Sequence, residues 1–537
     1  MFKSKFANLG VLSAIVFLIA FLLYAKTINF KNTGLDDVNF VYTASSEYKG
    51  AGAFFNAFAH NVLFEKSPTP YYRPMLAVSF IADNHIAGES EKFSHFTNIL
   101  LHAFSCVLLF LFLYKYVFSK LVSFLAAVTF AVFPIMIYTA AWIPGRNDSI
   151  FFIAFILALI FFIRFINDKK PLDIFAHILF LLICFFTRES ALIIPAIFVL
   201  YAVLVEQKKW SFFRKKEFLI LLALWICSII FFTYMRKFAL HIEGGGFPSR
   251  LNLTDDNIGM TWDYYASVFF LRSPFAPNTG GWITVMGIIS FLVFAFFIFA
   301  TKDKTKLKRN IFYFLLPLFF ILPALISERL WFQGNRMYVA MFGFIVLFYS
   351  FLSPFIDNGE KAKQKIKIAV LSFVSVLLIV CCILTFNQMN YFNGQLAFWG
   401  KILSQAKRKD FTIDKFYAYA LMQAGRPQEA VRQLLPAANA LRFSYNEINY
   451  ALGQAFLLSG DFNNAIKVYQ LMVDNKQMEV PQVYASIVIG YAYLNDQKNV
   501  DIWIDKMAKT FNISSQAAVD YIGRFNQYLR SMGKNNA

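Results

Sequence analysis

Cysteine and histidine are scarce in this sequence, and their positions argue against the sites they usually form. The 537 residues include five Cys and six His. All the cysteines fall inside apolar runs, at Cys106, Cys184, Cys227, Cys381 and Cys382. Cysteines in such runs are typical of small core residues rather than of a disulfide framework. No Cys/His spacing fits a zinc site either.

Charged residues are also few, at 15% of the chain, whereas 58% of the residues are hydrophobic and 67 are Phe. A soluble domain this apolar could not cover itself with polar surface, so lipid must be part of its solvent. The net charge of +19 would suit a nucleic-acid partner. The Lys and Arg residues, however, lie in short clusters between apolar runs, which is the pattern of membrane topology. We therefore expect a bilayer and no nucleic acid.

Long apolar runs dominate the first 390 residues. A membrane-spanning helix needs about 20 apolar residues, and about eleven runs approach that length. They begin near Leu9, Phe96, Leu121, Ser149, Leu172, Ala191, Phe218, Gly281, Ile311, Met337 and Ile368, and the last ends near Phe386. The predicted fold is all-α, a polytopic bundle of membrane helices over residues 1–389.

Basic residues occupy every other short loop. They precede the first run and follow the second, fourth, sixth, eighth and tenth runs. The positive-inside rule then places the N-terminus in the cytoplasm. The loops that hold Asp36, Arg146, Glu189 and Arg336 face outward, as does everything after Phe386. We expect a bacterial inner membrane, although an endoplasmic reticulum membrane would fit the same topology.

The composition becomes that of a soluble domain after about Asn390. Gly425 and Gly460 are 35 residues apart, and so are Ala430 and Ala465. This spacing is close to the period of about 34 residues in tetratricopeptide repeats. Residues 390–537 are therefore predicted to form a tetratricopeptide-like α-solenoid outside the cytoplasm. Such repeats could cap the membrane domain, or form a groove that holds a polypeptide.

The first outer loop, residues 30–95, contains an acidic pair and two apolar segments too short to span. Asp36 and Asp37 follow the first run directly. By themselves they would fit an ordinary turn with solvated carboxylates. Phe54 and Phe58 recur at helical spacing, and Met75–Ala82 is a short apolar run. Both segments suggest helices lying in the membrane interface.

Arginines recur in the outward loops, on the same side as the acidic pair. They are Arg73, Arg146, Arg188 and Arg336. Each alone would fit a solvated loop or a snorkelling anchor. A cluster of them would suit phosphate oxygens.

Further polar candidates lie close to these arginines in the sequence. They are Tyr72, Asn98, His102, Asp148 and Glu189. Asn98 and His102 share one face of the second span. Intramembrane polar residues suggest function, but a hydrogen bond between packed helices explains each one equally well.

The order of these motifs resembles the GT-C glycosyltransferases, most closely the protein O-mannosyltransferases that carry tetratricopeptide repeats. The resemblance covers nearly the whole chain. It rests on the acidic pair after the first span, Tyr72-Arg73-Pro74, Asn98 and His102, Trp142 to Asp148, Arg188-Glu189-Ser190-Ala191, Arg336 with Tyr338, and the terminal repeats.

This resemblance implies a sugar donor on a polyprenyl phosphate and transfer on the outer face without a nucleotide sugar. Asp36, with Asp37 second, would act as base toward the acceptor hydroxyl. Arg73, Arg146 or Arg336 would stabilise the departing phosphate, and a single displacement would invert the anomeric carbon. A divalent metal, Mg²⁺ or Mn²⁺, could bridge the two acids, or the reaction could need none.

Two alternatives remain open from the sequence. The same donor could serve a lipid or a cell-envelope glycan instead of a protein. The chain could also be a transporter or flippase, although its charged residues gather at one face rather than at the midplane sites typical of transporters.

Overall fold

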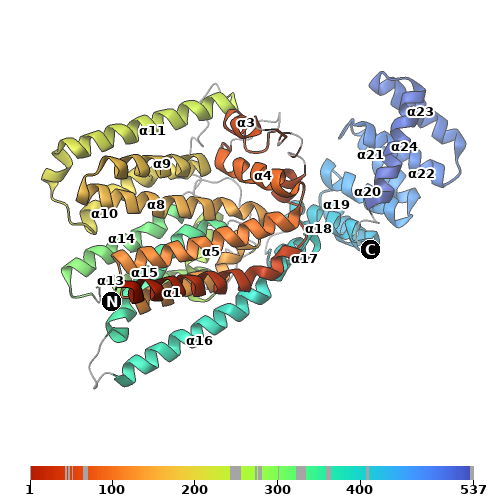
Figure 1. Ribbon diagram of the computed structural model, residues 1–537. Helices are drawn as coiled ribbons and strands as arrows, with labels where there is room; N and C mark the ends of the chain where they lie inside the picture. Colours follow the sequence, from red (N-terminus) through yellow and green to blue (C-terminus); the bar gives the residue numbers. More distant parts are fainter. Residues whose placement is uncertain are drawn as a thin grey trace. The chain divides into compact units, whose positions relative to one another are not determined.

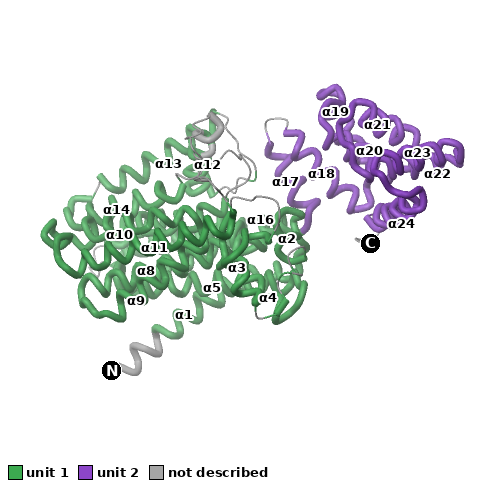
Figure 2. The backbone as a smooth tube through the Cα atoms, turned by 90° about the horizontal axis from the view of Figure 1, so that it is seen from above, with its two compact units in different colours: residues 1–393 green, residues 394–537 purple. Residues whose placement is uncertain are grey.

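A computed structural model gives the fold of residues 2–532. Residues 43–44, 46, 48, 51, 65–70, 242–254, 272–274, 276–280, 300, 322–333, 358–363 and 407–409 within that range are not described, nor are residue 1 and residues 533–537. The described residues form helices and no strand, as the sequence predicts. The chain divides into two compact units, Met1–Asn393 and Gly394–Ala537 (Figure 2).

Among the described residues of unit 1, seven helical segments are long and apolar enough to cross a membrane. Most consist of one helix, and some include an adjoining 3-10 turn. They are α1 (Phe2–Tyr24) with η1 (Ala25–Asn29), α5 (Glu91–Tyr116), η4 (Ile143–Gly145) with α8 (Arg146–Asp168), α11 (Lys216–Leu240), α13 (Gly281–Phe299), η8 (Gly334–Arg336) with α15 (Met337–Ile356), and α16 (Gln364–Gln388) with η10 (Met389–Phe392).

An eighth span is possible if a bent segment counts as one. It consists of α6 (Lys120–Val132), η3 (Pro134–Met136) and α7 (Ile137–Ala140), with a bend of 54° at the break. The break coincides with Pro134, whose ring cannot continue the helical hydrogen bonding and restricts the residue before it.

The three remaining predicted runs form shorter or more polar helices. These are α9 (Pro171–Thr187), η5 (Glu189–Ile193) with α10 (Ile194–Leu204), and α14 (Lys304–Ile321), whose first turns are basic. The predicted count of about eleven spans is therefore not confirmed, because length and composition support seven or eight among the described residues. The chain is nevertheless an integral membrane protein.

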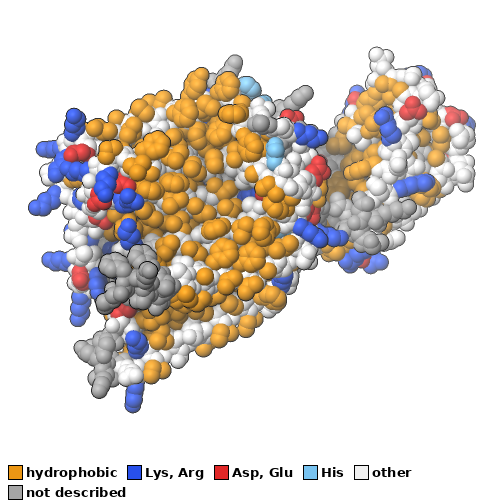
Figure 3. All heavy atoms as spheres, in the orientation of Figure 1, with side chains coloured by type: hydrophobic (Ala, Val, Ile, Leu, Met, Phe, Trp, Pro, Cys, Tyr) orange, Lys and Arg blue, Asp and Glu red, His pale blue; other side chains and the backbone are white. Residues whose placement is uncertain are grey.

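The surface of unit 1 agrees with that class. Its long helices lie side by side in Figure 1, and apolar side chains cover the face seen in Figure 3. Lys and Arg side chains gather at the end of the bundle where α1 begins. Helices α3 (Ala53–Ala59) and α4 (Pro74–Ala87) lie at the other end, where α1 finishes (Figure 1).

The first outer loop has a small core of its own, which holds α2 (Asp36–Val41) in place. α2 packs against α4 and against η4 at the start of the third long span. The core consists of Phe40, Val41, Ala53, Ala57, Val62, Leu76, Ala77, Phe80, Ile81 and Ile143. The two predicted short helices therefore exist as α3 and α4, and their apolar faces fix the position of the acidic pair.

Unit 2 consists of eight described helices, each packed against the next in the chain. They are α17 (Gln395–Gln405), α18 (Phe411–Gln423), α19 (Pro427–Ala440), α20 (Asn446–Ser459), α21 (Phe462–Asp474), α22 (Pro481–Tyr493), α23 (Gln497–Phe511) and α24 (Ser515–Met532). The side chains of Asp410, Asp461 and Asp496 cap α18, α21 and α23 by accepting backbone hydrogen bonds. Such caps fix where a helix begins.

Small residues allow close helix contacts in unit 2. A Cβ atom added at Gly453 in α20 would lie 2.5 Å from the Tyr469 ring, and one at Gly490 in α22 would lie 2.7 Å from Ile466. We expect Gly453→Ala to destabilise unit 2 by about 1–3 kcal/mol, because overpacking forces neighbouring side chains to move.

The matched control is Gly523→Ala in α24, where an added Cβ meets nothing within 4 Å. That change should leave stability equal or slightly higher, since Ala favours a helix interior over Gly. The measurement is urea-induced loss of protease resistance of unit 2 in the full chain. Equal midpoints for both variants would contradict the packing argument.

Candidate active site

The two carboxylates of the acidic pair have different surroundings. Asp36 begins α2 and is exposed, whereas Asp37 is 1% exposed. The backbone N–H and the hydroxyl of Thr33 both donate to Oδ2 of Asp37, at 2.6 and 2.8 Å. Among the described residues, Oδ1 makes no hydrogen bond of ordinary geometry. Adjacent positions in the sequence have therefore become one solvated acid and one buried acid.

Burial raises the pKa of Asp37 to about 7. The negative charge of Asp36 raises this pKa further, whereas the Thr33 hydrogen bonds and the Trp142 indole lower it. Desolvation dominates because the charged form loses more hydration than two hydrogen bonds restore. Asp37 is thus poised to take up or release a proton near neutral pH.

Glu189 joins the first outer loop to the end of α9. Its Oε1 accepts from the backbone N–H of Tyr72 at 2.9 Å, and its Oε2 pairs with Nε of Arg73 at 3.2 Å. The Tyr72 side chain is buried, and its hydroxyl donates to the carbonyl of Phe58. Arg73 keeps part of its side chain accessible. Tyr72 therefore shapes the loop, and Arg73 is held at its surface.

Asp148 forms a second junction between distant segments. Its Oδ1 pairs with Nη1 of Arg188 at 2.6 Å, and its Oδ2 accepts from Nδ2 of Asn335 at 2.7 Å. Arg73 and Arg336 also interact electrostatically with this carboxylate. Residues from four separate loops therefore meet at Asp148.

Four arginines converge here, and we call Arg73, Arg188, Arg236 and Arg336 the arginine cluster. Arg336 interacts electrostatically with Arg188 and Arg73, and Arg236 of α11 interacts with Glu189. Nη1 of Arg336 is buried with no hydrogen-bond partner among the described residues.

The guanidinium groups of the arginine cluster lie near the carboxylates of Asp148 and Glu189, and those of Arg73, Arg188 and Arg336 also lie near one another. Like charges held close together in a partly buried site are costly unless an anion joins them. Guanidinium groups match phosphate oxygens in charge and geometry, so the cluster is suited to bind an anionic group of that kind.

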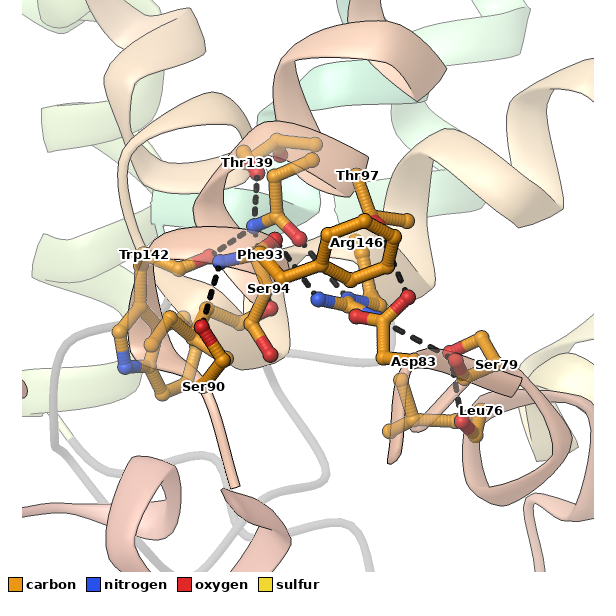
Figure 4. Close-up of polar contacts among 12 residues, drawn as sticks. Leu76, Ser79, Asp83, Ser90, Phe93, Ser94, Thr97, Thr139, Trp142 and Arg146 are labelled. Atoms are coloured by element: carbon orange, nitrogen blue, oxygen red, sulfur yellow. Dashed lines mark hydrogen bonds and ion pairs between the residues drawn. The ribbon is translucent and has the colours of Figure 1, made fainter. Parts of the chain in front are cut away.

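Arg146, one of the predicted phosphate ligands, is surrounded by protein groups (Figure 4). Its side chain is 0% exposed, and Nη1 pairs with Oδ2 of Asp83 at 2.6 Å. Nε donates to Oδ1 of Asn98, and Nη2 donates to the carbonyl of Ser94, each at 2.8 Å. The guanidinium also lies over the Phe80 ring. Its donors are thus directed at protein groups rather than toward an open site.

Asn98 and His102 also bond to protein groups. Nδ2 of Asn98 donates to the carbonyls of Trp142 and Ile143, at 2.7 and 3.0 Å. The two ring nitrogens of His102 lie 2.8 Å from the Tyr338 hydroxyl and 3.2 Å from the Ala131 carbonyl. These contacts fit the alternative in which each residue forms hydrogen bonds between packed helices.

The acidic pair approaches this polar network through Trp142. The indole of Trp142 lowers the pKa of Asp37. The backbone carbonyl of Trp142 accepts a hydrogen bond from Asn98, and Asn98 accepts one from Arg146. In the described part of the chain, no ion pair joins Asp37 to an arginine. The acidic pair and the polar residues around Arg146 therefore lie on neighbouring elements without direct contact.

Sequence reasoning missed Thr33, Asp83, Arg236 and Asn335. Arg236 could have been found, because a charged residue inside an apolar run is a functional candidate by default. The other three gave no signal, since their partners lie far away in the sequence or in an irregular turn. Within the described ranges, no group of three or more His, Cys, Asp or Glu side chains is placed to bind one metal ion.

No family model matches the chain. The fold defines an integral membrane protein, and one stretch of the sequence is similar to that of a known protein. That relative is the human protein O-mannosyl-transferase TMTC1, which is 29% identical over 123 residues. The matched stretch covers 23% of this chain and 13% of TMTC1.

The contrast between Arg146 and Arg73 can be measured. We expect Arg146→Met to destabilise unit 1 by about 3–5 kcal/mol, because it leaves the Asp83 carboxylate buried without its cation. Arg73→Met should cost less than about 1 kcal/mol, since that arginine remains partly solvated. Fluorescence-detected size-exclusion chromatography after heating detergent-solubilised protein would report both. Equal loss in the two variants would refute the assignment of Arg146 to the scaffold.

Proposed function

We propose that this chain is a GT-C-type glycosyltransferase that moves a hexose such as mannose from a polyprenyl phosphate to a hydroxyl group of a protein. The reaction takes place on the extracytoplasmic face of a membrane, in bacteria the inner membrane. The observation that carries this proposal is the arginine cluster, together with the similarity to TMTC1.

The arginine cluster supports the donor assignment. As the bond to the sugar breaks, the departing phosphate gains negative charge, and cations already in place stabilise that charge most effectively. Arg73 and Arg336 are the partly accessible members of the cluster, so they are the proposed phosphate ligands. Arg188 is held by Asp148 and supports them through its charge.

The first outer loop supports a lipid-linked donor. Phe55 of α3 is 81% exposed and Ile86 of α4 is 71% exposed, although both helices bury their other faces in the loop core. Exposed apolar residues on short helices next to membrane spans suit contact with lipid chains. A polyprenyl chain could lie there with its phosphate at Arg73.

Asp37 is the proposed base, with Asp36 as the second candidate. The acceptor hydroxyl gives its proton to the carboxylate, and its oxygen forms a bond to the anomeric carbon. The bond from that carbon to the phosphate oxygen breaks, and its electron pair stays on the phosphate. A single displacement inverts the configuration. A base whose pKa lies near the working pH is the most efficient, and Asp37 meets this condition.

A protein acceptor is proposed because TMTC1 is a protein O-mannosyl-transferase and because unit 2 could present a polypeptide. A lipid or cell-envelope glycan is the alternative acceptor for the same donor. A divalent metal such as Mg²⁺ or Mn²⁺ could assist at Asp36 and Asp37, and transfer in the presence of EDTA would decide this. For a transporter, sugar would cross the membrane without any new glycosidic bond.

Substitution of the acids tests the catalytic assignment. Asp37→Asn should reduce transfer of mannose from a synthetic polyprenyl-phosphate mannose to membrane proteins by at least about 10³-fold, because the amide cannot accept the proton. Asp36→Asn is the matched control and should retain at least about a tenth of the activity. Radiolabelled transfer in membranes of a strain lacking the native gene measures both. Wild-type rates in the Asp37 variant would reject the assignment.

The donor assignment has its own test. Arg73→Met and Arg336→Met should each raise the donor KM by about 10-fold or more, since a charged hydrogen bond to phosphate contributes about 1.5–3 kcal/mol. Arg426→Met, which removes an exposed arginine paired with Glu429 in unit 2, should leave the donor KM unchanged. Donor KM values that stay at the wild-type level in both cluster variants would remove the arginine cluster from the site.

A further inference from the structure

Thr33 occupies the turn between η1 and α2 and directs two donors at one oxygen. Its side chain is buried, and its N–H and Oγ1–H both bond to Oδ2 of Asp37. Two hydrogen bonds from one residue fix the torsion of the carboxylate as well as its position. The second oxygen, Oδ1, is buried and makes no hydrogen bond of ordinary geometry among the described residues.

The turn that presents Thr33 is itself anchored. Gly34 has a φ of 73°, a conformation in which a Cβ would be strained. Oδ1 of Asn32 accepts from the Gly34 N–H, and Nδ2 of Asn32 donates to Oε1 of Glu91. Glu91 also accepts from the hydroxyl of Tyr42, directly after α2. Both ends of α2 are thus tied to the first turn of α5.

We infer that Thr33 is a positioning residue for the proposed transfer, which holds Oδ2 of Asp37 so that Oδ1 receives the proton of the acceptor hydroxyl. This inference rests on the proposed function. Without the Thr33 hydroxyl, the carboxylate can rotate and either oxygen can turn toward protein groups. The base would then be misaligned in part of the population, which lowers kcat rather than donor binding.

Thr33 also favours the ionised form of Asp37. Its two hydrogen bonds lower the pKa of a carboxyl group that burial has raised. Asp36 is the neighbouring charged group on α2 that raises this pKa. On the elements packed against α2, Asp83 of α4 pairs with Arg146, and His85 of α4 bonds to the carbonyl of Ile81.

The test compares Thr33→Val, which removes the hydroxyl at nearly constant volume, with Thr33→Ser, which keeps it. Each full-length variant is assayed with synthetic polyprenyl-phosphate mannose from pH 5 to pH 9. In the wild type, kcat/KM should rise with pH to a midpoint near 7, because the ionised carboxylate is the active form. Thr33→Val should move the midpoint up by about one unit and lower kcat about 10-fold at pH 7. Thr33→Ser should restore both, with an unchanged donor KM throughout.

A stability measurement separates this inference from the proposed function. The folded-state pKa of Asp37 lies above its usual value of 3.8. Protonation therefore favours the fold, and stability falls as pH rises toward and through 7. In Thr33→Val this fall should extend to higher pH, and in Asp37→Asn it should be absent. Thr27→Val is the matched control, because the buried Thr27 hydroxyl bonds to the Tyr24 carbonyl instead. It should lower Tm equally at every pH.

The transfer and stability measurements separate the two proposals. In one outcome, the curve of Tm against pH for Thr33→Val matches that of the wild type apart from a uniform offset. This result overturns the inference, whatever the transfer assay gives. In a second outcome, the fall in Tm of Thr33→Val extends to higher pH but the wild type transfers no sugar. That result supports the contact between Thr33 and Asp37 and rejects the glycosyltransferase proposal. A Thr33→Val enzyme with a wild-type pH profile, while Asp37→Asn is inactive, also overturns the inference.

Discussion

The buried ion pair between Arg146 and Asp83 is the constraint on which the end of unit 1 that holds α2 and α4 depends. Asp83 belongs to α4 in the first outer loop, and Arg146 begins α8, the third long span. Two charges removed from water are stable only when they are paired and fully hydrogen-bonded. Arg146 reaches Asn98 and Ser94 of α5 as well, and Thr97 of the same helix binds the other oxygen of Asp83. One guanidinium thus fixes the loop against two spans.

The same physics separates the arginines into two groups. The guanidinium of Arg146 directs its donors at Asp83, Asn98 and Ser94, and these contacts fit a structural role. Arg336, in contrast, has a buried Nη1 without a partner among the described residues, and it lies near two further guanidiniums. Guanidinium groups that lie close together repel one another, and an anion between them would relieve this repulsion. The proximity of Arg336 to Arg73 and Arg188 is therefore an argument for an anionic ligand.

The sequence predicted those features that depend on local pattern. Among the described residues, apolar runs located the seven segments of unit 1 that are long enough to span a membrane, and the spacing of Phe54 and Phe58 located α3. Both features depend on the pattern of neighbouring residues. The sequence could not separate the roles of Arg73 and Arg146, since both stand in similar outward loops. Their difference comes from Asp83, which lies 63 residues before Arg146. The predicted count of about eleven spans is not confirmed, because α9 and the segment of η5 and α10 are apolar but short.

The sequence interpretation placed Asp36 before Asp37 as the base, and the proposed preference for Asp37 follows from the fold instead. Two adjacent acids at the start of a helix point to different sides, and only the packing of α2 against α4 and η4 decides which side is buried. That packing depends on η4, whose carbonyls are held by Asn98, which in turn holds Arg146. The scaffold ion pair therefore acts on the acid through the loop that carries Trp142. The proposed role of Asp37 as base needs such a link, because a loop without one would let the carboxylate move away from the proposed donor site at the arginine cluster.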